Sequence, residues 1–89
     1  MQLTPDAEFV EICRSIVACG RTEAEWCEQE SGDEFQTPLF SGGYEAIESA
    51  FCFSYYDASG GEWWFQVTLE EAQRIAASER PVIELRQAE

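Results

Sequence analysis

The sequence predicts a small α+β domain whose elements follow the order α-α-β-β-α-β, with a three-stranded, mainly antiparallel sheet packed against the helices. Apolar residues recur with a helical period over residues 5–19 and 69–78, and they alternate with a period of two on either side of a glycine-rich turn at 57–61. The chain has 89 residues, of which 45% are hydrophobic. This length and composition suit one domain, 1–89, with a single core.

The first helix is expected over residues 5–19. Thr4 is the predicted N-cap, Pro5 suits the first helical position, and Gly20 is a natural terminator. With about 100° between successive residues, the apolar side chains fall within an arc of about 160°. The core-facing arc holds Phe9, Val10, Ile12, Cys13, Ile16 and Val17.

A second, shorter helix is predicted by a capping box, the segment TEAE that begins at Thr22. The helix is expected to end near Glu30, where a serine and a glycine follow. Its apolar side holds only Ala24, Trp26 and Cys27. We therefore expect this helix to pack weakly and to expose mostly acidic side chains.

The next segment, residues 31–43 (SGDEFQTPLFSGG), has the composition of a loop. Its expected anchors to the core are Phe35, Leu39 and Phe40. Two glycine pairs are interpreted as turn glycines: Gly42-Gly43 and Gly60-Gly61. The residues 44–48 that follow fit either a helical turn or the start of a strand.

A β-hairpin is expected over residues 51–68, because apolar residues alternate on both sides of the turn. In its second strand one face carries Trp63, Phe65 and Val67. Trp64 points to the opposite face, near Ser54 or Tyr56. There it either covers a second side of the sheet or serves as an interface anchor, a frequent role of tryptophan.

A third helix follows a second capping box, the segment TLEE that begins at Thr68, and it is expected to run from Leu69 to about Ser78. Its inward-facing residues are Leu69, Ala72, Ile75 and Ala76. Pro81 ends it, and residues 82–86 are expected to form the third strand. Because a helix separates the second and third strands, we expect these two to run in the same direction. The third then pairs beside the first, in the order 2-1-3.

The charge is the most unusual property of the chain. Eighteen acidic residues oppose five basic ones, with no histidine, so the net charge is −13. Such a charge disfavours nucleic acid and anionic membranes as direct partners and favours a basic protein surface. The acids are densest on residues 23–34 and, on a helical wheel, they surround the second helix without forming one row. The predicted partner-binding residues are Glu23, Glu25, Glu28, Glu30, Asp33 and Glu34, extended by Glu11, Glu45 and Glu48 and joined by Trp64.

No enzymatic activity, catalytic residue, metal or cofactor is expected. Histidine, the commonest general base, is missing, and no nucleophile, phosphate-binding or dinucleotide-binding motif occurs. The cysteines lack the CxxC spacing of structural zinc sites, so core packing is preferred to zinc or a disulfide. They are Cys13, Cys19, Cys27 and Cys52. Without a signal-peptide pattern or a long apolar segment, a cytoplasmic monomer with reduced thiols is expected.

The chain resembles the small, acidic, phage-encoded anti-CRISPR proteins, particularly inhibitors of type I systems and most closely those of type I-C. The likeness is carried by the length, the charge, the acidic segment 23–34 and the hairpin FCFSYYDASGGEWWFQVT. It implies binding to a Cas subunit of a surveillance complex, so that carboxylates replace DNA phosphates and target DNA cannot engage. Two other hypotheses stay open: an adaptor or antitoxin-like module that binds through the aromatic hairpin, and a small metal or redox protein.

Overall fold

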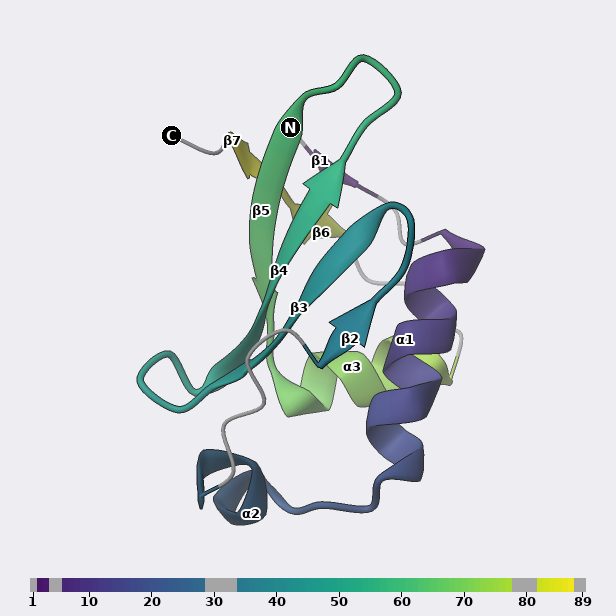
Figure 1. The fold of residues 1–89 in the computed structure, drawn as a ribbon. Helices are drawn as coiled ribbons and strands as arrows, with labels where there is room; N and C mark the ends of the chain where they lie inside the picture. Colours follow the sequence, from purple (N-terminus) through teal and green to yellow (C-terminus); the bar gives the residue numbers. More distant parts are fainter. Residues whose placement is uncertain (1, 4–5, 29–33, 78–81, 88–89) are drawn as a thin grey trace.

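The computed structural model describes residues 2–3, 6–28, 34–77 and 82–87, and it shows an antiparallel sheet of five strands with helices against one face (Figure 1). In spatial order the strands are β2 (Phe35–Gln36), β3 (Phe40–Glu45), β4 (Ala50–Tyr56), β5 (Glu62–Val67) and β7 (Arg86–Gln87). A separate pair joins β1 (Gln2–Leu3) to β6 (Ile83–Glu84). The helices are α1 (Ala7–Ala18), α2 (Glu23–Glu28) and α3 (Leu69–Ala76). The α+β class is confirmed.

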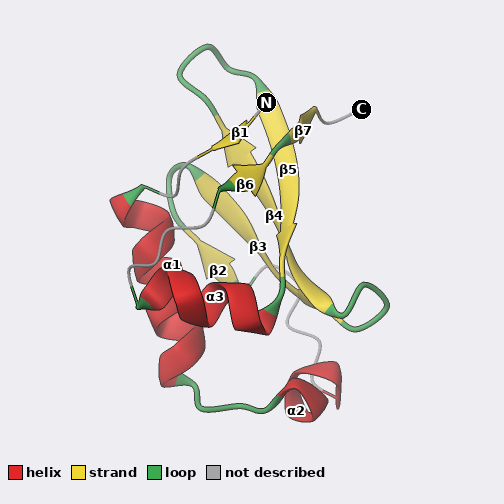
Figure 2. Cartoon of the chain, turned by 180° about the vertical axis from the view of Figure 1, so that it is seen from behind, coloured by secondary structure: helices red, strands yellow, loops and turns green. Residues whose placement is uncertain are grey.

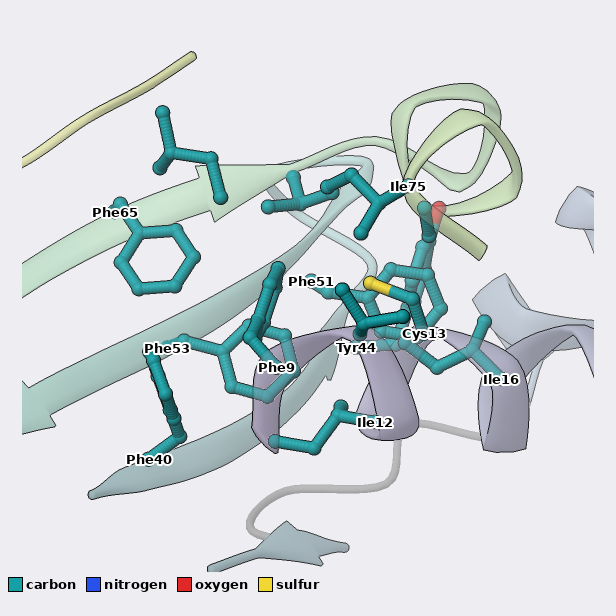
Figure 3. Packing of buried hydrophobic residues seen from close by; sticks show 14 of the residues in the cluster. Phe9, Ile12, Cys13, Ile16, Phe40, Tyr44, Phe51, Phe53, Phe65 and Ile75 are labelled. Carbon is teal, nitrogen blue, oxygen red and sulfur yellow. The ribbon is translucent and has the colours of Figure 1, made fainter. Parts of the chain in front are cut away.

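The core lies between α1 and the sheet (Figure 3). Phe9 of α1 is fully buried, and its ring meets the rings of Phe53 and Phe65 edge-on, with both pairs of centroids 5.2 Å apart. Such pairs contribute about 0.5–1.5 kcal/mol each beyond the area they bury. The alternation of the hairpin is as predicted, because Phe53 and Phe65 face the helices and Trp64 points to the other face, opposite Ser54 in register.

Local motifs set the start of α2, the start of α3 and the end of α1 as predicted, with one correction at the start of α1. The predicted ends of the second and third helices, near Glu30 and Ser78, lie outside the described residues. The capping boxes at Thr22 and Thr68 both form, and Gly20 follows α1 with a φ of +67°. Asp6, not Thr4, caps α1, since its carboxylate accepts the backbone N–H of Phe9 at 3.0 Å. Thr4 and Pro5 lie outside the described residues.

Two expectations about helix faces were wrong. Val17, placed on the core-facing arc of α1, is 43% exposed, whereas its neighbour Ile16 is buried. The second helix exposes its glutamates as expected and has one buried residue, Trp26, whose ring centroid lies 5.0 Å from that of Phe51. Cys27, expected on the packing side, is exposed.

The sheet differs from the prediction in the number and order of its strands. The predicted loop contains β2 and the first four residues of β3, and β3 pairs with β4 along its whole length. Gly42 and Gly43 therefore lie in a strand, not in a turn. A Cβ added to Gly42 would come 2.0 Å from the carbonyl oxygen of Cys52, so this strand pair needs a glycine there. Residues 44–48 fitted either a helical turn or the start of a strand. In the structure they form the end of β3 and most of a turn at 46–49.

The last strand also lies elsewhere than predicted. β7 pairs with β5, not with β4, and runs antiparallel to it. Figure 1 shows the reason: α3 crosses the end of the sheet where β5 stops, so the helix does not return along the strands. β7 adds to the free edge of β5. The other edge of β4 is already occupied by β3.

Candidate partner-binding surface

Predicted acidic residues from two distant segments come together at one end of the sheet. β3 ends at Glu45 and β4 begins at Ala50, and α2 lies beside the turn between them (Figure 2). A contact of 3.4 Å between the Cys27 thiol and the Tyr44 hydroxyl connects α2 to β3. α2 and the turn therefore lie at the same end of the sheet. The exposed acids of these two segments are Glu23, Glu25, Glu28, Glu45 and Glu48.

A further acid that was not among the predicted partner-binding residues, Glu70, lies at this end. Because β4 and β5 are antiparallel, with Phe51 opposite Val67, α3 begins at the same end of the sheet at which β4 begins. Glu70, in the first turn of α3, is exposed there and pairs with Arg74. The hairpin and the capping box at Thr68, both predicted from the sequence, together carried the signal for this position. We call this group of exposed acids at one end of the sheet the acidic end, and its members are Glu23, Glu25, Glu28, Glu45, Glu48 and Glu70.

The acids of α2 have unequal roles. Glu25 accepts hydrogen bonds from the backbone N–H of Thr22 at 3.0 Å and from its hydroxyl at 3.1 Å, and these bonds lower the pKa of Glu25. Its carboxylate caps the helix and stays ionised. Glu23 and Glu28 have no such role and are both exposed. They are the acids of α2 best suited to meet a partner.

The other acidic residues predicted to bind a partner either form ion pairs within the chain or lie outside the described residues. Glu34 is 3.8 Å from the guanidinium of Arg21, which also lies over the Trp26 ring at 4.6 Å from its centroid. Glu11 pairs with Arg14 on the outer side of α1. Glu30 and Asp33 lie outside the described residues.

The open face of the sheet carries a hollow of about 330 Å³ next to the acidic end. Trp64 is half-buried and forms one wall, while Glu45 and Glu48 lie at another. Gln66 donates its side-chain N–H to Oε2 of Glu48 at 3.1 Å, which holds that carboxylate in place. The structure thus brings three predicted residues to one site, formed by β3, β4, β5 and the turn at 46–49.

The cysteines are all free thiols. Burial raises the pKa of Cys13 to about 12, so this thiol is unreactive in the core. The pKa of Cys52 is also raised to about 12, first by burial and then by a hydrogen bond and the negative charge of Glu45. Across the ranges that the structure describes, no three Cys, Asp or Glu side chains are grouped as metal ligands.

Comparisons of the chain with models of protein families, with curated proteins and with solved structures found no match. Among the described residues, no helix has both the length and the apolar character needed to cross a bilayer.

Proposed function

We propose that this chain is a non-enzymatic inhibitor that binds a basic, nucleic-acid-binding protein surface through its acidic end. The observation that carries the proposal is the grouping of exposed carboxylates from α2, the β3–β4 turn and α3 at one end of the sheet. A dense patch of one charge attracts the opposite charge at long range and raises the rate of association. A protein groove that holds DNA phosphates offers such an opposite charge.

Among the described residues, arginine pairs with one member of the acidic end, since Arg74 pairs with Glu70. Arg14 and Arg21 pair with glutamates outside it, and Arg86 lies over the ring of Trp64. Among the described residues the acidic end therefore keeps a large negative excess. The proposed partner is a Cas subunit of a type I, particularly type I-C, surveillance complex, whose target DNA the inhibitor would exclude.

The test measures binding of the purified chain to a purified type I-C surveillance complex at low and at high salt, together with competition against target DNA. We expect association that slows steeply as salt rises and loss of DNA binding when the chain is bound. The double variant Glu23→Gln/Glu28→Gln should weaken binding about tenfold, mostly through slower association.

The matched control is Glu62→Gln/Glu84→Gln, which removes the same charge from exposed positions outside the acidic end. It should retain most of the affinity. Equal weakening by both double variants, salt-insensitive binding, or no binding to the complex would overturn the proposal.

The adaptor hypothesis keeps one supporting observation, the half-buried Trp64 on the open sheet face. It predicts that Trp64→Ala abolishes partner binding while the double variant in α2 leaves it unchanged. The same binding assay separates the two functions.

A further inference from the structure

The hollow on the open face of the sheet owes its shape to the size of the side chains that line it. Three small residues from β3 and β4, Ser41, Cys52 and Ser54, form its floor. Longer side chains rise around them, namely Glu45, Glu48, Trp64 and Gln66. The resulting volume, about 330 Å³, lies at the lower end of the range of about 300–1,000 Å³ that ligand pockets occupy.

The charge of the hollow is entirely negative, since its lining includes two carboxylates and no cation. Glu48 is held at the rim by the side-chain amide of Gln66, at 3.1 Å. Burial, and after it the hydrogen bond and charge of Glu45 and the charge of Glu48, raise the pKa of Cys52, so a further negative charge is disfavoured in this environment. A cationic side chain is the complementary occupant.

Trp64 adds an aromatic wall that already accepts a guanidinium within the chain. The guanidinium carbon of Arg86 lies 5.4 Å from the centroid of the Trp64 ring, within the range of a cation–π contact. Arg86 lines a neighbouring hollow beside β6 and is absent from the lining of this one, whereas Trp64 lines both. Arg86 is therefore not one of the residues that line the first hollow.

We propose that this hollow receives one arginine side chain of the basic protein partner, with its guanidinium against Trp64 and its N–H groups directed to Glu45 and Glu48. Arginine is preferred to lysine because its planar guanidinium stacks on aromatic rings, binds carboxylates with two parallel hydrogen bonds and is more weakly hydrated than an ammonium. The inference rests on the proposed function. It adds the place on this chain at which one residue of the partner is anchored.

The experiment compares two short peptides of equal length and charge, one containing arginine and the other lysine at the same positions. Binding is followed by nuclear magnetic resonance of the tryptophan indole N–H groups. We expect the arginine peptide to bind about fivefold more tightly and to shift the Trp64 indole, while the fully buried Trp26 stays unshifted. Equal affinity for both peptides, or no shift at Trp64, would overturn the inference.

Variants separate recognition in the hollow from general attraction. Trp64→Ala and Glu48→Gln should both bring the ratio of the two affinities close to one, and Trp64→Phe, which keeps an aromatic face, should retain part of the preference. Glu28→Gln is the matched control, because it removes the same charge as Glu48→Gln but lies on α2, outside the hollow. It should weaken both peptides equally and leave the ratio unchanged; a ratio that falls as much as with Glu48→Gln would count against the hollow.

The outcome is distinguishable from that of the proposed function. If the surveillance complex binds in a salt-dependent way and Glu23→Gln/Glu28→Gln weakens it, while the peptides show no arginine preference, the function stands and the hollow is not the anchor. If the arginine preference is found but the complex does not bind, the hollow is retained and the proposed partner is wrong.

Discussion

Replacement of Trp26 by alanine tests how α2, and with it half of the acidic end, is held on the domain. Trp26 is the buried residue of this six-residue helix. Its ring centroid lies 5.0 Å from that of Phe51, 6.0 Å from that of Tyr44 and 6.2 Å from that of Phe35. A single buried anchor therefore connects α2 to the sheet.

The magnitude follows from the burial of the ring. Truncation of a fully buried tryptophan or phenylalanine to alanine costs about 3–5 kcal/mol. Natural domains are stable by only about 5–15 kcal/mol, so Trp26→Ala should remove a large part of the free energy of unfolding. The indole N–H of Trp26 is buried and has no hydrogen-bond partner among the described residues. Since such a group costs about 1–3 kcal/mol, Trp26→Phe, which deletes it and keeps a ring, should lose much less stability than Trp26→Ala.

The assay is urea denaturation followed by far-ultraviolet circular dichroism. The free energy of unfolding and its dependence on urea concentration are compared between variants. Ile47→Ala is the control, because Ile47 is a large apolar residue of the same end of the domain that is 87% exposed. It should change the free energy of unfolding by less than about 0.5 kcal/mol. A loss below about 1 kcal/mol for Trp26→Ala would refute the conclusion that this residue anchors the helix.

Three further variants test other contacts. Gly42→Ala should lower stability by about 1–3 kcal/mol, since its Cβ would collide with the Cys52 carbonyl; an unchanged melting temperature would contradict the close approach of β3 and β4. Asp57 accepts hydrogen bonds from the Trp63 indole and two backbone N–H groups, which lower its pKa below 3.8. This stabilisation is complete above about pH 4 and is lost as pH falls through the lowered pKa. Asp57→Asn should therefore show a flatter dependence of stability on pH in the acid range, and an identical dependence would argue against these bonds. Thr68→Ala should cost about 0.5–2 kcal/mol by removing the cap of α3, whereas Thr68→Ser should cost little; equal losses in thermal denaturation would show that the cap is not the cause.

The elements that the sequence predicted well depend on neighbours within a few residues. The capping boxes at Thr22 and Thr68 and the terminator Gly20 involve contacts along a single turn of chain, and all three are found. The same holds for the hairpin, whose alternation and turn place Trp64 on the open face.

The sheet edge was missed because its strands lack a local pattern. β3 has the sequence FSGGYE, without a β-branched residue, and it becomes a strand because β4 supplies its hydrogen bonds and Cys52 leaves room only for Gly42. The surroundings of Trp26 could not be predicted for a related reason. A short helix with a single large apolar residue is expected to pack weakly. The aromatic side chains that surround Trp26 come from β2, β3 and β4, which are distant in sequence.

The sequence by itself determined the charge, the helices and the hairpin, since composition and short-range contacts are properties of the chain before it folds. Only the tertiary structure decided that carboxylates from residues 23–28, 45–48 and 70 share one end, and that a hollow walled by Trp64 lies beside them. The physical reason is that strand order and helix placement are set by burial between distant segments. A shift in that pairing would distribute the same acids over different faces of the domain.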